Sequence, residues 1–149
     1  MSKSEKKPLA IVDSNIILYA LNTDYADQDC HNKCLSLLEK ALKGQLDNTP
    51  ALNPIVIAEV FTVLKKLISL NEAESRITGL LQSRRIEYIS ISKEACQTGV
   101  RWAKEYNIPI NDALIAACAA EQAPTIYTAD EHFKKIKTKK IIFVNPINP

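Results

Sequence analysis

The chain has 149 residues and a mass of 16.6 kDa, the size of one domain with a substantial core. A net charge of +2 neither excludes nor requires a nucleic acid partner. No apolar run approaches the roughly 18 residues of a membrane span, and the polar start lacks a signal-peptide core. We therefore expect a cytoplasmic protein without membrane contact. A disordered N-terminal tail is expected over residues 1–8, one domain over 9–145 and a C-terminal tail over 146–149.

Short apolar runs alternate with helical patterns along the chain. The runs that predict strands lie at 9–12, 48–52, 86–91, 125–128 and 141–144. The patterns that predict helices start just behind Asp13 and then cover 26–43, 54–69, 72–83, 93–106 and 112–122. One or two further helical turns are expected in DEHFKKI, residues 130–136. No repeat, low-complexity segment or linker divides these elements.

Capping residues mark the expected helix ends. Asn53, Asn71, Ser92 and Asn111 each precede a helical pattern and are predicted N-caps, while Gly44 is the predicted end of the second helix. Strands that alternate with helices and read as continuous apolar runs are typical of a parallel sheet covered on both faces. The predicted fold class is therefore α/β, as a three-layer α/β/α sandwich around a mainly parallel sheet of about five strands.

Four acidic residues fall where such a sheet binds ligands. Asp13 follows the first strand directly, and Asp130 comes two residues after the run TIYT. Glu59 lies about a turn and a half inside the helix that follows the second strand. Asp112 begins a helix that must run back to the same edge, because a parallel strand follows it. The carboxyl ends of parallel strands share one edge, so these four carboxylates should converge there.

Carboxylates held together in this way repel one another unless a cation lies between them. Oxygen ligands without histidine or cysteine suit Mg²⁺ or Mn²⁺, and such ions are often completed by phosphate oxygens of a substrate. We therefore expect one or two such ions with only oxygen ligands from the protein. A phosphate-binding Walker loop is missing from the sequence, which argues against a nucleoside triphosphate site.

Each acid also has a purely structural interpretation. Asp13 could form an Asx-turn, Asp112 could favour the positive end of its helix, and Asp130 could be an N-cap. Glu59 is harder to explain in this way, because it interrupts the apolar run IVIAEVFTVL, and buried glutamates are usually paired or bound to metal.

The cysteines do not suggest a second metal site. Cys30 and Cys34 flank His31 in CHNKC, but no second pair of zinc ligands follows them. They and the isolated Cys96 and Cys118 are expected to be reduced thiols.

Four segments, VDSNIILYA, NPIVIAEVFTVL, NDALIAACAA and IYTADEHFKKI, together resemble the PIN domain, and in particular the single-domain VapC-type toxins. The resemblance implies a metal-dependent ribonuclease in which Asp13, Glu59, Asp112 and Asp130 are both the catalytic residues and the metal ligands. It further implies that Asn15 and Thr128 support the site through hydrogen bonds. A small antitoxin protein would be the partner, the chain would form a homodimer, and RNA would be the substrate.

Basic and apolar segments give candidate contact surfaces. The residues that could contact the RNA backbone are Lys65, Lys66, Lys134, Lys135 and Lys137. For all of them a solvated surface is the alternative. The apolar stretches IILYA and FTVLKKLI could contact the antitoxin, although core packing explains most of their residues. Two other functions remain open, namely a stand-alone PIN nuclease that processes RNA or acts on DNA, and an inactive PIN module that only binds RNA or protein.

Overall fold

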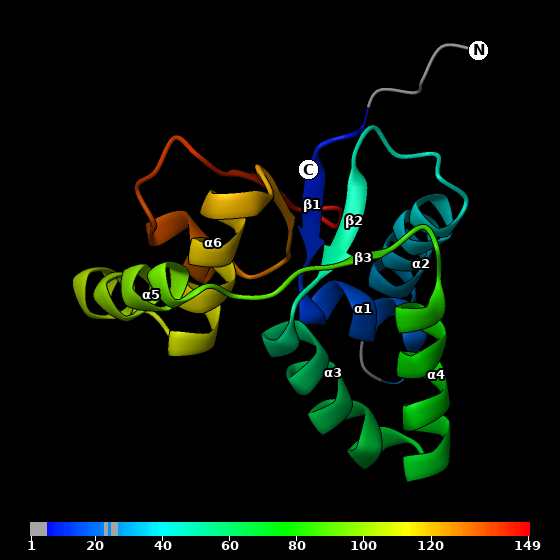
Figure 1. Cartoon of the computed structure of the whole chain (residues 1–149). Helices are drawn as coiled ribbons and strands as arrows, with labels where there is room; N and C mark the ends of the chain where they lie inside the picture. The colour runs from blue at the N-terminus through cyan, green and yellow to red at the C-terminus, as the bar shows by residue number, and fades with distance from the viewer. Residues whose placement is uncertain (1–5, 23, 25–26) are drawn as a thin grey trace.

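The computed structural model describes residues 6–22, 24 and 27–149, and in this part of the chain five parallel strands form one sheet (Figure 1). The strands are β1 (Leu9–Val12), β2 (Thr49–Leu52), β3 (Glu87–Tyr88), β4 (Thr125–Tyr127) and β5 (Ile142–Val144). Their order across the sheet is β3-β2-β1-β4-β5. The first strand therefore lies in the centre, with β2 on one side and β4 on the other.

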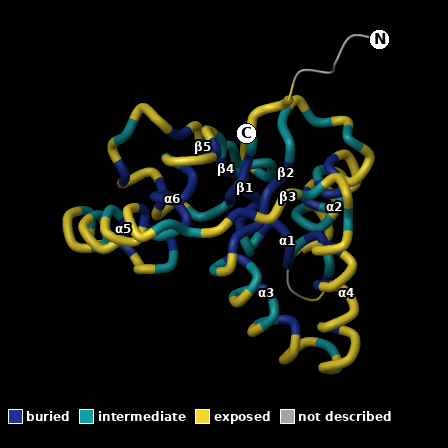
Figure 2. Tube along the Cα trace, in the orientation of Figure 1, coloured by how far each residue is buried: buried dark blue, intermediate teal, exposed yellow. Residues whose placement is uncertain are grey.

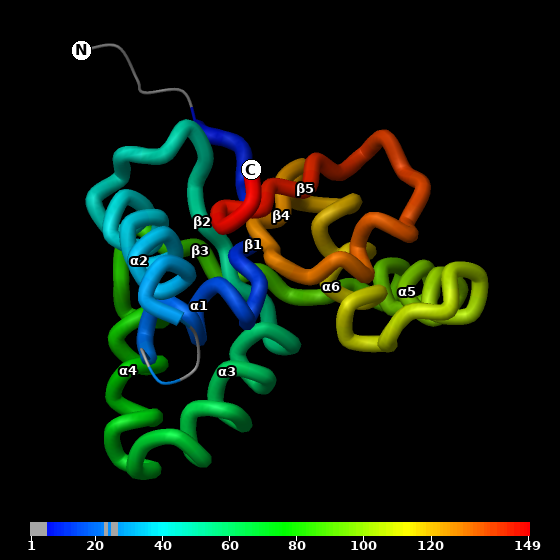
Figure 3. The backbone as a smooth tube through the Cα atoms, turned by 180° about the vertical axis from the view of Figure 1, so that it is seen from behind, coloured from blue at the N-terminus to red at the C-terminus, as the bar shows by residue number. Residues whose placement is uncertain are grey.

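Helices cover both faces of this sheet. They are α1 (Ser14–Leu21), α2 (Gln28–Leu42), α3 (Pro54–Leu67), α4 (Leu70–Gln82), α5 (Lys93–Tyr106), α6 (Ile110–Gln122) and the 3₁₀ helix η1 (Glu131–Lys135). Helices α5 and α6 lie on one side, and α2 and α4 on the other, in both the front and the rear view (Figures 1 and 3). The predicted α/β/α architecture is confirmed. None of the helices within the described ranges combines the length and apolarity needed to cross a membrane.

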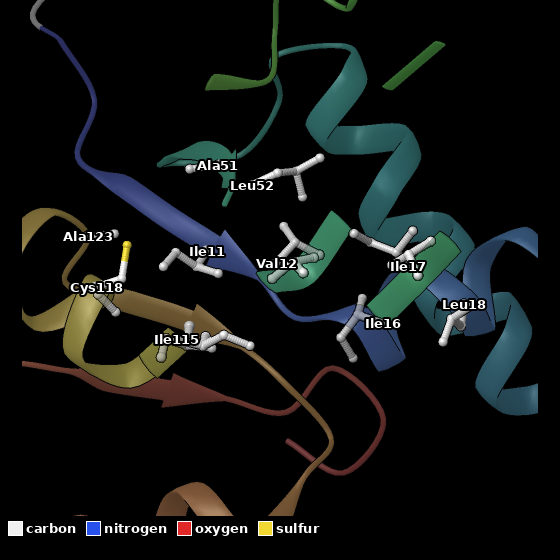
Figure 4. Close-up of a cluster of buried hydrophobic side chains, with 14 of the residues drawn as sticks. Ile11, Val12, Ile16, Ile17, Leu18, Ala51, Leu52, Ile115, Cys118 and Ala123 are labelled. Atoms are coloured by element: carbon white, nitrogen blue, oxygen red, sulfur yellow. The ribbon is translucent and has the colours of Figure 1, made fainter. Parts of the chain in front are cut away.

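The core explains why the central strands are continuous apolar runs. Burial is concentrated in β1, in the strands beside it and along α6, while α4 and α5 expose their outer faces (Figure 2). Successive residues of β1 point to opposite faces. Ile11 lies near Ile115 and Cys118 of α6, whereas Val12 points to the other face (Figure 4). Apolar side chains cover both faces of β1, so a polar residue within the strand would be buried without water. The first polar side chain in this part of the chain is Asp13, where the strand has ended.

Most of the predicted helix ends agree with the structure. The Asn53 side chain accepts a hydrogen bond from Val56 N at 3.0 Å and caps α3, and Ser92 caps α5 in the same way. Gly44 follows the end of α2 with a φ of 69°, the left-handed conformation that glycine adopts at little cost. The predicted start of α2 at residue 26 lies outside the described residues.

Two of the predicted caps are wrong. Helix α4 is capped by Ser69, whose Oγ accepts from Glu72 N at 3.1 Å, so Asn71 lies inside the helix. Helix α6 starts at Ile110 behind Pro109, and Asn111 lies in its first turn. A proline just before the first turn has a suitable φ, and its missing N–H removes no helical hydrogen bond. The Asn111 side chain is therefore free to contact another helix.

The predicted strand over 86–91 is too long. Only Glu87 and Tyr88 pair with β2, and Ile89 N adds one hydrogen bond to Leu52 O. The neighbouring strand ends at Leu52, because Asn53 turns the chain into α3. Beyond Ile89 the predicted strand has no partner in the sheet.

The two ends of the domain make side-chain contacts. Residues 1–5 of the predicted N-terminal tail lie outside the described residues, whereas the Lys7 ammonium donates hydrogen bonds to the carbonyls of Gly44 and Leu46. In the predicted C-terminal tail, the Ile147 carbonyl accepts a hydrogen bond from Lys33.

Two helical glycines should respond in opposite ways to a methyl group. A Cβ at Gly99 of α5 would lie 2.8 Å from Leu114 Cδ2 and 3.2 Å from Leu114 Cα of α6, while a Cβ at Gly79 of α4 would meet nothing within 4 Å. We expect Gly79→Ala to raise the free energy of unfolding by about 0.5–1 kcal/mol through helix propensity. Gly99→Ala should lower it by about 1 kcal/mol, since overpacking outweighs that gain. Chemical denaturation of the two variants tests this contrast, and equal effects would contradict the close packing of α5 on α6.

Candidate metal centre

Asp13 joins the central strand to the first helix. It lies at the carboxyl end of β1, and only 2% of its surface is exposed. One carboxylate oxygen accepts a hydrogen bond from Ser14 N at 2.8 Å, where Asp13 caps α1. The other oxygen accepts from the Thr128 hydroxyl at 2.7 Å. Because Thr128 follows β4, these two hydrogen bonds hold the carboxylate between the ends of neighbouring strands.

The side chain of His132 lies between Asp112 and Asp130. Asp112 lies in the first turn of α6 and is 7% exposed, and Asp130 caps η1 through a hydrogen bond from His132 N at 2.8 Å. The His132 Nδ1 atom lies 3.3 Å from Asp112 Oδ2 and 3.0 Å from Asp130 Oδ1. The imidazole thus bridges two acids that are far apart in the sequence.

Glu59 is held by side chains from two other helices. One of its oxygens accepts a hydrogen bond from Ser14 Oγ at 2.9 Å, and the other accepts from Asn111 Nδ2 at 3.2 Å. Ser14 is the first residue of α1, and Asn111 is in the first turn of α6. These contacts fix the carboxylate of α3 relative to both helices and explain how a glutamate is accommodated beside the core.

Burial and mutual repulsion raise the pKa values of two acids in the cluster. Burial raises the pKa of Asp13 from 3.8 to about 6, and the charges of Glu59 and Asp130 add to the rise, against the lowering effect of its two hydrogen bonds. Burial also raises the pKa of Asp112 to about 7, helped by the charges of Asp130, Asp13 and Glu59 and opposed by His132. Asp13 and Asp112 therefore each lie within electrostatic range of Glu59 and Asp130, and a cation among these acids would relieve the repulsion.

Two shallow clefts open on this cluster. One, of about 400 Å³, is lined by Glu59, Asp112, Asp130 and His132 together with the start of α6. The second has a similar volume and lies between α1 and α3, where Leu18, Ala58 and Val63 contribute apolar surface. Glu59 and Asn111 line both clefts, so Glu59, Asp112 and Asp130 are accessible to a substrate along a continuous surface.

Comparison with known proteins identifies the family. The sequence profile of the PIN domain matches residues 10–139, which is most of the chain. The chain belongs to the PIN domain family. PIN domains are nucleases, so the acidic cluster lies in a chain from a family of phosphodiester-cleaving enzymes. A comparison with curated proteins finds no match to the chain.

Solved structures of other proteins have the same fold. A chain in the structure of VapBC2 from Rickettsia felis, bound to a DNA fragment from their promoter, is 27% identical, with a TM-score of 0.66 over 91% of this chain and 96% of that one. Mycobacterium tuberculosis VapC20, described as a sarcin-ricin loop cleaving toxin, is 13% identical, with a TM-score of 0.69 over 87% and 97%. FitAcB from Neisseria gonorrhoeae is 20% identical, with a TM-score of 0.62 over 94% and 99%. At 13% and 20% identity, the last two comparisons support the fold alone.

The donor groups of this PIN domain suit a divalent cation. Within the described part of the chain, the ligand atoms of Asp112, Asp130 and His132 all lie within 4.8 Å of one another, close enough to share an ion. Asp13 and Glu59 add carboxylates beside them, and carboxylate oxygens are the ligands that Mg²⁺ and Mn²⁺ prefer. The raised pKa values of Asp13 and Asp112 fit the same interpretation, because a bound cation would restore their ionised forms.

The other predicted site residues differ in how close they come to the acids. Thr128 contacts Asp13 directly and also accepts a hydrogen bond from Asp130 N at 3.0 Å, whereas Asn15 accepts from Ala129 N at 3.4 Å. Lys134 and Lys135 lie in η1, directly after Asp130, and Lys137 follows them. Lys65 and Lys66 lie in the last turn of α3, six and seven residues beyond Glu59. At about 1.5 Å per residue, they are roughly 10 Å further along that helix.

Sequence reasoning missed three residues of the site. The predicted ligand set had only oxygen donors and left out His132, whose Nδ1 atom contacts two of the four acids. Its position two residues after Asp130, at the start of a helical turn, was the available signal. Ser14 could have been inferred from its place beside Asp13. Asn111 gave no usable signal, because its contact with Glu59 depends on how α6 packs against α3.

Proposed function

We propose that the protein is a divalent-metal-dependent endoribonuclease that hydrolyses RNA phosphodiesters, and that it is the toxin of a toxin–antitoxin pair. The observation that carries this proposal is the convergence of four carboxylates at the carboxyl edge of the sheet, where Glu59, Asp112 and Asp130 line an open cleft and the buried Asp13 lies within electrostatic range of Asp112. No simple structural role requires Asp13 and Asp112 to be held with raised pKa values beside two further acids.

In this mechanism, the carboxylates of Asp13, Asp112 and Asp130 would hold one or two Mg²⁺ or Mn²⁺ ions. When bound, such an ion supplies Lewis-acid charge at the scissile phosphate and lowers the pKa of water. Glu59 completes the ligand set or orients the attacking water, because each of its oxygens keeps an acceptor site beyond the hydrogen bonds from Ser14 and Asn111. Thr128 positions Asp13, and Asn15 holds the backbone between Thr128 and Asp130.

RNA would approach over the basic residues around the cleft. Lys134, Lys135 and Lys137 are the better placed of the predicted lysines, since they follow Asp130 directly, although Lys134 also forms an ion pair with Glu131 at 2.7 Å. Lys65 and Lys66 would contact more distant phosphates. These lysines bind the phosphate backbone, so their contribution should weaken as salt increases.

Similar chains support an antitoxin partner. One similar structure is a toxin–antitoxin complex from Klebsiella pneumoniae, and another is VapBC2 from Rickettsia felis. In this chain, the cleft between α1 and α3 is lined by residues of both predicted contact stretches, Leu18 from IILYA and Thr62 and Val63 from FTVLKKLI. An antitoxin segment in this cleft would contact Glu59 and block the site. We further propose that the chain forms a homodimer and is located in the cytoplasm.

Two alternative functions predict different behaviour of the purified protein. A stand-alone PIN nuclease that processes RNA or acts on DNA would need the same acids but no antitoxin. An inactive module would bind RNA or protein without cleaving it. The intact set of four acids favours an enzyme over the inactive module.

A cleavage assay separates these functions. Single-stranded RNA and DNA of the same sequence are incubated with the purified chain in Mg²⁺, in Mn²⁺ and in EDTA. We expect RNA to be cleaved internally with either ion and to stay intact in EDTA, because the carboxylates alone cannot stabilise charge on the phosphate. Equal cleavage of DNA would favour the alternative nuclease. RNA binding without cleavage in any buffer would favour the inactive module.

A further inference from the structure

The histidine in the acidic cluster is placed as a ligand and not only as a neighbour. Its Nδ1 atom lies 3.0 Å from Asp130 Oδ1 and 3.3 Å from Asp112 Oδ2, so the side chain reaches both carboxylates. In an octahedral ion with ligands at about 2.1 Å, adjacent ligand atoms are about 3 Å apart. The two distances from Nδ1 match the spacing of adjacent ligands around one ion, and the ligand atoms of all three residues lie within 4.8 Å of one another.

The local backbone keeps the histidine in this position. Asp130 and His132 are two residues apart, and the hydrogen bond from His132 N to Asp130 Oδ1 at 2.8 Å closes the turn that starts η1. Phe133, the next residue, is fully buried and anchors the turn in the core. The His132 side chain itself is 48% exposed, so packing does not require an imidazole here. A residue without a packing role that faces the buried Asp112 and the partly buried Asp130 points to a ligand role.

We propose that His132 is a direct metal ligand of the site, and that this makes the site select a transition-metal cation such as Mn²⁺ over Mg²⁺. The inference rests on the proposed metal-dependent function and narrows it. Imidazole nitrogen favours first-row transition metals, whereas Mg²⁺ strongly favours oxygen ligands and keeps its waters. A ligand set of carboxylates plus one imidazole therefore differs in selectivity from an all-carboxylate set.

Direct binding measurements test this selectivity without relying on activity. Titration calorimetry with Mn²⁺ and with Mg²⁺, at one fixed pH, is done on the full chain and on His132→Ala. We expect the ratio of Mn²⁺ to Mg²⁺ affinity to fall by about tenfold or more in the variant, the scale of effect seen when groups around a metal site are removed. His132→Asp, which gives an all-oxygen set, should bind Mg²⁺ more tightly than His132→Ala does.

The matched control is His31→Gln, which replaces the other histidine of the chain. His31 contacts the carbonyl of Tyr19 at 2.8 Å and is not among the groups that contact the acids. In pulsed electron paramagnetic resonance of the Mn²⁺-loaded protein, we expect nitrogen modulation from coordinated imidazole in the wild type and in His31→Gln. The same signal should be lost in His132→Ala.

The outcomes separate this inference from the proposed function. If the wild type binds Mn²⁺ but His132→Ala keeps both the affinity ratio and the nitrogen signal, His132 is not a ligand, and the carboxylate site stands without it. If the wild type binds neither ion, both the inference and the metal-dependent function are wrong.

Discussion

Replacing Asp13 by asparagine is expected to reduce the rate of RNA cleavage by about a thousandfold or more in saturating Mg²⁺ or Mn²⁺. The Lewis-acid contribution of a bound ion is several kcal/mol, and each 1.36 kcal/mol corresponds to about a tenfold change in rate. Asparagine is the most informative replacement, because it keeps the shape and the oxygen that caps α1 through Ser14 N. The variant should therefore lose activity and remain folded, as judged by its thermal melt.

The control for this variant is Asp29→Asn. Asp29 lies in the first turn of α2 and forms an exposed ion pair with Lys33 at 3.0 Å, so it carries the same charge outside the cluster. Its removal should leave cleavage within about twofold of the wild type, since exposed ion pairs of this kind contribute at most about 1 kcal/mol. If Asp13→Asn cleaves RNA as fast as this control does, Asp13 is not part of the active site.

The free energy of unfolding of the metal-free protein is expected to fall as the pH rises from about 5 to about 8, by roughly 2–4 kcal/mol. Burial raises the pKa values of Asp13 and Asp112 to about 6 and about 7 in the folded protein. Between the unfolded and folded pKa values, the folded state holds more protons than the unfolded state, so raising the pH favours unfolding. The stability that protonation provides is therefore present at low pH and is lost through this window.

Urea denaturation in EDTA across this pH range measures the effect, and Asp112→Asn supplies the comparison. The variant removes one of the mutually repelling charges, so its stability should depend less on pH and should exceed that of the wild type near pH 8 by about 0.5–2 kcal/mol. Added Mg²⁺ should stabilise the wild type more than the variant, because ligands stabilise the state that binds them. A variant much less stable than the metal-free wild type would show that Asp112 has a structural role.

The sequence predicted the arrangement of this fold better than its boundaries. Alternating strands and helices, and the apolar run before Asp13, were sufficient to predict a parallel sheet with helices on both faces. The starts of α4 and α6 were wrong because several residues near each start can cap a helix, and the choice depends on tertiary contacts. The length of β3 depends on where its neighbour β2 ends, which local sequence does not indicate.

The predictions for the site show the same contrast, because the position of the acids was predicted and their side-chain contacts were not. The approach of the four acids followed from strand and helix directions alone, because both are set by the parallel sheet. The contacts of Ser14, Asn111 and His132 depend on rotamers and on how neighbouring helices pack, and those are not periodic features of a sequence. Polar residues one or two positions after a predicted ligand in a turn, such as Ser14 and His132, are therefore themselves candidates for contacts with the site.

The order of the strands has a consequence for the nascent chain. Of the five strands of this sheet, the central one is made first, and β4, which covers its second edge, follows more than one hundred residues later. Until then β1 has an open edge, Asp13 lacks the hydroxyl of Thr128, and Asp112 and Asp130 are not yet in place. A partly synthesised chain therefore has no complete set of acids. If the chain cleaves RNA, this activity begins only after the residues up to Asp130 have been made and have joined the sheet edge.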